Sequence, residues 1–446
     1  MVFSRWIYVF IAISLGVSAS IAHGQDSRLT SGAFVERSDK EFRDPSSGMS
    51  SSDLVQRALA SNSDLVASRL DVERARSRLR QSQLRPNPSV DVSQTTGRWT
   101  GSPEEKEFSV GLSVPVELGG KRGKRIDLAE ADLAAAEAEV ADRERLLAAE
   151  VRAAFAEAVT ALRELEITSE LNDLDRQTVQ FVQARVNEGD APPLELSLLR
   201  ADADRLRSRR NLTQGRLESA ILRLKRLTGI QTGDPLRFRE DLSTVPVIEP
   251  PTLNVALETA LAMRPDLRFA RLSEQVAEAG LNLARAQAVP DITLSTRYSR
   301  GTTLFDETPV GILRDRDKAL SFGATISLPI LNRNQGAKAE AQTSILQAQH
   351  RREFIESLVR FEVNSAYSRY QAAQSAVAIY ESGIISRAEE NIRSVRGAYE
   401  IGAFRITDLL NEQRRLVDFQ REYTDALAER YRALADINAA IGMPVN

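Results

Sequence analysis

The chain has 446 residues and a formal net charge of −3; 27% of its residues are charged and 6% are aromatic. This balance favours a helix-rich, water-compatible protein over a helical membrane bundle, and it argues against nucleic acid as a main partner. Cysteine is absent and only His23 and His350 could supply imidazole, which excludes disulfides, thiol catalysis, a lipidated N-terminal cysteine and a histidine metal cluster. We therefore expect no metal site and no cofactor.

The N-terminus has the pattern of a targeting signal. Arg5 precedes an apolar run, Trp6–Val17, and small residues follow it. This order predicts a signal peptide over residues 1–24, whereas a transmembrane anchor is disfavoured because the run is short and no charged cluster follows at once. Residues 25–52 are rich in Ser, Asp and Arg without periodicity, and they predict an irregular extension.

The rest of the chain contains an internal sequence repeat. It predicts a first repeat over 53–230, a linker over 231–256 and a second repeat over 257–446. Each repeat is expected to contain a helix, a strand pair, a long helix, a turn and a returning helix. The matching landmarks are ALASNSDLVASR (58–69) with ALAMRPDLRFAR (260–271), LSVPVEL (112–118) with ISLPILN (326–332), and VNEGDAPPLEL (186–196) with YEIGAFRITDL (399–409).

The longest predicted element is a helix from Lys124 to Glu188. This stretch contains no Gly or Pro, consists mostly of strong helix formers, and places apolar residues at coiled-coil seam spacing. Gly189 suits a left-handed cap, and the prolines after it can start a returning helix. Its counterpart, 336–399, is expected to be less continuous because it carries Gly383 and Gly397. The remaining expected helices are 64–84, 194–227, 266–288 and 405–441.

Two stretches alternate between apolar residues and small or polar residues, Phe108–Val116 and Leu320–Ile330. Their expected partners, Val90–Thr96 and Ile292–Tyr298, alternate less cleanly. One apolar face and one small, polar face over about ten residues are typical of membrane β-barrel strands. A soluble sheet covered by helices is the alternative, because alternation alone does not separate the two.

Four strands are too few for a membrane barrel, which needs about eight or more. An open sheet edge in lipid would leave backbone amides unsatisfied, so several chains must share one barrel, and three would give twelve strands. The polar strand turns, Trp99–Lys106 and Gly301–Lys318, would then face outside. The helical turns at Gly189 and Gly402 would lie together at the opposite, periplasmic end.

This plan resembles the TolC-like outer-membrane efflux protein family, and PVELGGKR (115–122) and LPILNRNQG (328–336) resemble its cobalt–zinc–cadmium efflux (CzcC-like) subfamily. The resemblance implies a mixed, mostly α fold: a homotrimeric barrel in the outer membrane of a Gram-negative bacterium, continuous with a periplasmic α-helical tunnel. It implies a passive exit duct that touches outer-membrane lipid. Its partners would be a periplasmic adaptor (membrane fusion protein) and an inner-membrane resistance-nodulation-division pump, and its cargo heavy-metal cations.

The resemblance also assigns residues at the two helical turns. The adaptor-docking tips would be Val186, Gly189, Asp190, Tyr399, Gly402 and Phe404, and the gate candidates Tyr399, Asp408, Asn411 and Glu195. Tyr399 matches a tyrosine that helps hold the closed gate, and Asp408 an acidic position that rings the narrow end. Against this, a Gly at a helix turn is a cap by default, and an Asp in a first helical turn stabilises the helix dipole whatever its function.

Other function classes fit less well. A Ser/His/Asp enzyme is excluded by the single mature histidine, and GGKRGKR (119–125) lacks phosphate-loop spacing. We interpret that segment as a tight turn with basic residues at the membrane edge, able to touch anionic lipid. A soluble periplasmic coiled-coil adaptor is disfavoured because there are two hairpins, each joined to a strand pair. An exit duct for drugs or other organic compounds, or the outer component of type I protein secretion, remains open.

Overall fold

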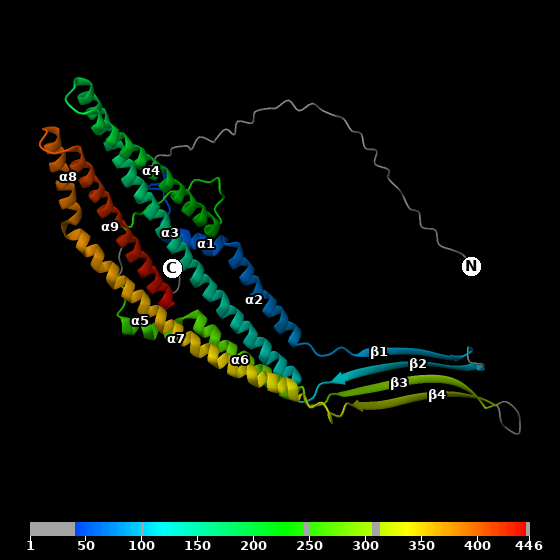
Figure 1. The fold of residues 1–446 in the computed structure, drawn as a ribbon. Helices are drawn as coiled ribbons and strands as arrows, with labels where there is room; N and C mark the ends of the chain where they lie inside the picture. The colour runs from blue at the N-terminus through cyan, green and yellow to red at the C-terminus, as the bar shows by residue number, and fades with distance from the viewer. Residues whose placement is uncertain (1–40, 100–101, 245–248, 306–312, 443–446) are drawn as a thin grey trace, which may run out of the picture. The chain divides into compact units, whose positions relative to one another are not determined.

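The computed structural model describes residues 41–99, 102–244, 249–305 and 313–442, and the expected signal peptide lies outside them. These residues form long helices and one four-stranded sheet, in the order that Figure 1 shows. Each half of the chain supplies two shorter helices, a strand pair, a long helical segment and a returning helix. The predicted fold class, mostly helical with four strands, is confirmed.

The sheet is antiparallel, with the strands in the order β1 (Ser89–Gly97), β2 (Ser102–Val116), β3 (Ile292–Phe305) and β4 (Leu313–Ile326). Directly paired residues share a face, so the pairing of Val110 with both Val92 and Tyr298 puts the apolar side chains together. This apolar face is exposed in the single chain, where Phe322 is 79% exposed. The exposure argues against a sheet covered by helices.

The strands differ from the predicted ones at both ends. β2 begins at Ser102 and β3 continues to Phe305, so much of both expected turns is strand. Polar residues fill these extensions, and the apolar alternation stops there although the backbone pairing continues, for example between Lys106 and Thr302. β4 ends at Ile326, short of the expected Ile330 and three residues before Pro329, which lacks the N–H that a ladder requires.

The expected long helix of the first half is present as α3 (Lys121–Glu188), and it returns as α4 (Pro193–Thr228). It starts three residues earlier than predicted, directly after Gly120, whose φ of 70° is left-handed. Its middle buries small and apolar side chains against α4 and against the short helix α1: Ala148, Val151, Ala154, Phe155, Ala158 and Leu162. Small side chains on the seam allow this close packing.

The corresponding helix of the second half is broken, as the glycines predicted. It consists of α7 (Gln335–Ile379), a π-helical turn η2 (Tyr380–Ile384) and α8 (Ile385–Glu400), and it returns as α9 (Ile406–Ile441). The break lies at Gly383, where φ is 118° and ψ is 12°. Gly397, by contrast, stays helical within α8. The predicted 336–399 element is therefore two helices joined by a non-helical residue.

Two short helices were not predicted, α1 (Ser51–Ser61) and α5 (Leu253–Met263); each precedes an expected helix, α2 (Ser63–Ser82) or α6 (Pro265–Ala286). The extension that was expected to be irregular pairs with the linker: Phe238 bridges both Arg43 and Met49. The Phe238 ring is fully buried and meets Phe155 edge-on, with ring centroids 5.7 Å apart. The extension and the linker thus cap the core of the first hairpin.

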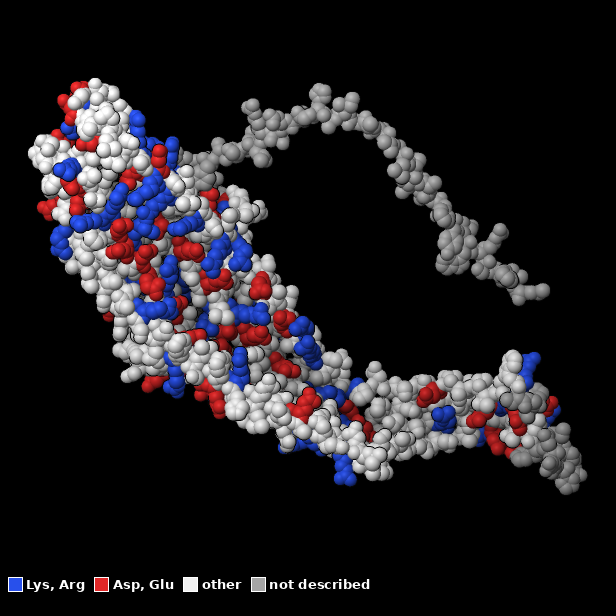
Figure 2. Space-filling model, in the orientation of Figure 1, with Lys and Arg blue, Asp and Glu red and all other residues white. Residues whose placement is uncertain are grey.

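Acidic and basic side chains are intermixed over the helices on the face that Figure 2 shows, whereas the middle of the sheet carries few charges there. This pattern fits helices that contact water along their length. Among the described residues, no helix has a segment long and apolar enough to cross a membrane.

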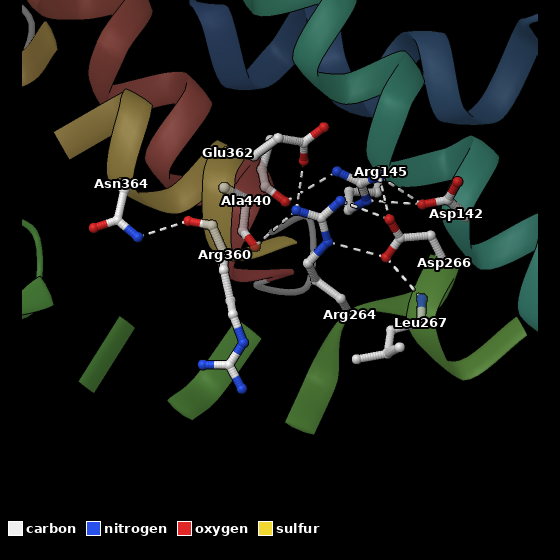
Figure 3. Close-up of polar contacts among 10 residues, drawn as sticks. Asp142, Arg145, Arg264, Asp266, Leu267, Arg360, Glu362, Asn364 and Ala440 are labelled. Atoms are coloured by element: carbon white, nitrogen blue, oxygen red, sulfur yellow. Dashed lines mark hydrogen bonds and ion pairs between the residues drawn. The ribbon is translucent and has the colours of Figure 1, made fainter. Parts of the chain in front are cut away.

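A buried guanidinium anchors the base of the second hairpin (Figure 3). Arg264 is 1% exposed, and its Nε and Nη2 donate to the two oxygens of Asp266 at 2.9 and 2.6 Å. Its Nη1 donates to Glu362 of α7 at 2.6 Å and to the Ala440 carbonyl of α9 at 3.4 Å. Burial disfavours the charged form of Asp266, but the bonds and charge of Arg264 outweigh burial and hold its pKa below the usual range.

The first half has a neutral group at the same place. Asn62 caps α2 by accepting bonds from two backbone N–H groups, and its Nδ2 donates to the Leu227 carbonyl at the end of α4. Ser61 Oγ donates to the next carbonyl, that of Thr228. Both halves therefore tie the end of the returning helix to the start of the second short helix, one through an amide and one through buried ions.

Candidate functional site

The first hairpin turns at a helix end built by hydrogen bonds from two successive N–H groups. Gly189 has a φ of 85°; its N–H donates to the Val186 carbonyl, and the Asp190 N–H donates to the Arg185 carbonyl at 2.8 Å. This is the Schellman arrangement, which needs a residue with positive φ. Pro193 then begins α4, where the lack of an N–H has no cost.

The second hairpin turns in the same way. Gly402 has a φ of 79° and donates to the Tyr399 carbonyl, while the Ala403 N–H donates to the Ala398 carbonyl at 2.8 Å. Phe404, 49% exposed, and Arg405 follow before α9 begins. Both turns expose backbone and side chains beyond the helix ends, as a docking tip requires.

The two tips pack on each other through an apolar cluster. It joins α3 and α4 to α8 and α9, and its buried members are Val182, Leu196, Leu199, Tyr399, Ile406, Leu409 and Leu410. Val186 is partly buried against it. We call this set the tip cluster. The structure thus brings the two predicted turns together within one chain.

Tyr399 carries the polar link across the tip cluster. Its side chain is 3% exposed, and its hydroxyl donates to Glu195 Oε2 at 3.1 Å. The Arg185 guanidinium lies over the ring, with Cζ 5.9 Å from the centroid. Burial first, and the Glu195 carboxylate second, raise the pKa of Tyr399 to about 12, so the hydroxyl remains a neutral donor at physiological pH.

The other predicted tip and gate residues lie around this link without joining it. Asp408 Oδ2 accepts from the Arg405 backbone N–H at 3.0 Å, which closes the first turn of α9. Asn411 and Asp190 are exposed. Asp408 therefore has a helix-capping contact of its own, as the alternative interpretation of that residue requires.

Arg185 and a polar layer below the tip cluster were not predicted from the sequence. Arg185 looked like one charge among many on a helical surface, and only the crossing of Tyr399 from the other hairpin distinguishes it. The polar layer consists of Asp175, Asp202, Gln413 and Arg414, from three helices. Its signal in the sequence was an acid at a position where the seam would otherwise be apolar.

The basic segment 119–125 makes polar contacts within the chain. Lys121 forms an ion pair with Asp291 at 2.7 Å, Arg125 pairs with Glu117, and Arg122 Nε donates to the Gln83 carbonyl at 2.8 Å. These charges fasten the start of α3 to the ends of neighbouring strands and helices. Contact of this segment with anionic lipid stays a prediction.

No group of three or more His, Cys, Asp or Glu residues that could hold a metal ion occurs in the described part of the chain. His350 lies on α7 with its side chain 80% exposed and 3.2 Å from Glu353. This pair is a surface contact between residues one helical turn apart.

The chain is similar in sequence to known proteins. The family profile for "Outer membrane efflux protein" matches residues 54–230 and 256–443. The chain is similar to the cobalt-zinc-cadmium resistance protein CzcC of Cupriavidus metallidurans, with 24% identity over 86% of this chain and 88% of the relative. It is also similar to the nickel and cobalt resistance protein CnrC of the same organism, with 26% identity over 73% and 72%.

Among solved structures, a crystal structure of CusC has the same fold. The TM-score is 0.73 at 22% identity, and the match covers 88% of this chain and 91% of that chain. The predicted resemblance to outer-membrane efflux proteins is confirmed by the profile and by the fold.

Proposed function

Since this chain belongs to the outer membrane efflux protein family, we propose that it is the passive exit duct of a tripartite heavy-metal efflux system. The observation that carries the proposal is the junction of two hairpin tips through Tyr399, at the end of a helical assembly whose sheet exposes an apolar face. Such a chain can form a conduit that opens at one end in a membrane and closes at the other.

The assembly that fits the sheet is a homotrimer. β1 and β4 are the edges of the four-stranded sheet, and their free backbone groups could not remain unpaired in lipid. Pairing β4 of one copy with β1 of the next closes a twelve-stranded barrel from three copies. Native mass spectrometry of the mature protein in detergent tests this: a trimer is expected, and a monodisperse soluble monomer would overturn it.

The adaptor would dock at the hairpin tips. Leu194, Ile401 and Phe404 are 67%, 82% and 49% exposed there, and aromatic residues such as Phe are enriched at protein interfaces. The energy source would be an inner-membrane pump of the resistance-nodulation-division type. The tip cluster and the Tyr399–Glu195 bond would keep the periplasmic end closed until the adaptor and pump engage.

Heavy-metal cations are the proposed cargo because CzcC and CnrC are named for resistance to cobalt, zinc, cadmium and nickel. Selection would lie in the pump and adaptor. A deletion strain should lose resistance to one or more of zinc, cobalt, nickel and copper, and the intact gene should restore it. Loss of tolerance to organic drugs alone, with metal tolerance unchanged, would replace this cargo by the organic alternative.

A further inference from the structure

A polar layer separates the tip cluster from the next apolar cluster of the helices. Asp175 of α3, Asp202 of α4 and Gln413 of α9 are only 1%, 8% and 6% exposed. Leu199 and Leu409 of the tip cluster lie on one side, and Leu206 and Val417 belong to the apolar cluster on the other. The layer therefore joins the first hairpin to the returning helix of the second, just behind the tips.

Asp175 has half of its carboxylate unsatisfied. Oδ1 accepts from Gln413 Nε2 at 3.3 Å, whereas Oδ2 is buried and has no hydrogen-bond partner among the residues that the structure describes. Asp175 and Asp202 line one cavity of about 210 Å³, which has room for water. A buried carboxylate oxygen without a donor disfavours the charged form of the group.

The charges around Asp175 do not compensate it directly. From α4, Asp202, Arg205 and Arg209 line the cavity, and from α9, Arg414 and Asp418 do so. Asp202 takes the nearest cations: its Oδ1 lies 3.0 Å from Arg414 Nη2 and 3.7 Å from Arg205 Nε. Three guanidinium groups at one small cavity also disfavour a metal cation. The ligand that suits an unsatisfied acid here is a proton.

Burial first, and the Asp202 charge second, raise the pKa of Asp175 to about 6, while the bond from Gln413 acts in the opposite direction. The ordinary value is 3.8. Because the pKa of Asp175 is raised in this arrangement of helices, protonation of Asp175 stabilises the arrangement. The stability of the arrangement then falls as the pH rises from about 4 to about 6, and the loss is complete above that range.

We propose that Asp175 is a proton-binding joint between the two hairpins. With a proton on Oδ2, the carboxyl is neutral, its repulsion with Asp202 is gone, and the new O–H can donate within the cavity. When Asp175 is ionised, the two carboxylates repel and water entry is favoured, so α3, α4 and α9 separate more easily and the tips beyond them loosen. The consequence for transport, a tighter periplasmic end in acid, rests on the proposed function.

Hydrogen exchange of the full-length protein in detergent, read by mass spectrometry over 179–199 and 399–410, tests the joint. The wild type is compared with Asp175→Asn, whose side chain is always neutral, at each pH from 4.5 to 8, so that the intrinsic pH dependence cancels. Equal exchange is expected near pH 4.5. Faster exchange of the wild type is expected above pH 6.5, by up to roughly 100-fold for a pKa shift of about two units.

Two further variants make the result specific. Asp202→Asn removes the repulsion, so the tips of this variant should loosen at a lower pH than the tips of the wild type. Asp173→Asn, on the same helix with a side chain 72% exposed, should follow the wild type at every pH. A constant ratio of wild type to Asp175→Asn across the pH range would overturn the joint and leave Asp175 a structural polar residue. So would an equal effect of Asp173→Asn.

Conductance in planar bilayers and the oligomeric state in detergent separate the joint from the duct. Channels that conduct, with tip exchange independent of the charge at position 175, would disprove the joint and leave the duct standing. A monodisperse soluble monomer that shows the expected pH-dependent exchange would disprove the duct and leave the joint standing.

Discussion

The two hairpins follow one plan but differ in the continuity of their long helices. In the first, α3 runs unbroken for 68 residues to its tip. In the second, the helix breaks at Gly383, and the separate helix α8 reaches the tip. Within α8, which is described in full, the buried residues are Ala388 and Tyr399. The first hairpin is therefore a continuous rod, whereas the second has a lightly packed end segment.

Two reciprocal hydrogen bonds hold the break in the second hairpin against α9. Tyr380 donates to Glu422 of α9 at 2.7 Å, and Tyr423 of α9 donates to Glu381 at 3.1 Å. The two tyrosine rings lie 6.0 Å apart. This reciprocal pair fixes the position of the π-helical turn, and Tyr399 holds the far end of α8. The break and the Tyr399–Glu195 bond, which we call the latch, therefore lie at opposite ends of α8.

The bases of the two hairpins also differ, one being held by a buried guanidinium and the other by a neutral amide. This difference gives the largest predicted loss of stability. Arg264→Met should destabilise the protein by about 3–5 kcal/mol, because Glu362 loses its buried cation and Asp266 keeps only the 3.8 Å ion pair with Arg145. Asn62→Ala should cost about 1–2 kcal/mol, the usual value of a helix cap. Thermal unfolding in detergent would measure both, with exposed Arg268→Met as the control. Equal losses at the two bases would contradict the comparison.

Next in size is a change at the tips. Gly402→Pro should cost about 3 kcal/mol or more at the turn, because proline cannot adopt a φ of 79° and cannot donate to the Tyr399 carbonyl. We expect resistance to be abolished while the barrel stays inserted, with outer-membrane abundance measured alongside. Gly397→Ala is the matched control, since an added Cβ there meets no atom of the described residues within 4 Å. Normal resistance at normal abundance would remove the tip from the mechanism.

A smaller effect is expected for the latch. Tyr399→Phe removes a buried hydrogen bond to a carboxylate, worth about 1.5–3 kcal/mol, and leaves the ring packed. Channel conductance in planar bilayers should rise at a given pH, and Tyr399 itself adds no pH dependence between pH 5 and pH 8, because its pKa of about 12 keeps the hydroxyl neutral there. Tyr298→Phe, on the exposed face of β3, is the control. Unchanged conductance would mean that the apolar cluster alone holds the tips.

These features differ in how visible they are in the sequence. Gly189, Gly402 and Gly383 were recognisable because a glycine interrupting a strong helical pattern marks a turn or a break locally. The Tyr399–Glu195 bond joins residues far apart in the chain, and no periodicity specifies such a pair; only the resemblance to known proteins suggested both as gate residues. Asp175 stands at a seam position that would otherwise be apolar, but its burial could not be predicted, because it arises only where three helices meet. Polar strand ends were missed because backbone pairing there does not need apolar side chains.

The smallest predicted effect concerns Asp408, where two roles compete. Its Oδ2 accepts from the Arg405 backbone N–H at 3.0 Å, and an acid in a first helical turn is worth about 0.3–1 kcal/mol to its helix. As one of three carboxylates around a narrow axis, it would instead favour cations and bind multivalent cations that block the pore. The capping contact needs only one chain, whereas the ring needs three.

Asp408→Asn separates these roles, because asparagine keeps an oxygen that can accept from the Arg405 N–H but loses the charge. As a cap, Asp408 should then tolerate the change with a small loss of thermal stability, and ion selectivity and cation block should stay as they are. As a ring, it should lose cation selectivity and divalent block in planar bilayers at nearly constant stability. The contact with Arg405 favours the first outcome. The second would show that the broken hairpin presents the first turn of α9 to the pore, whereas Glu195, in the first turn of α4, is bonded to Tyr399.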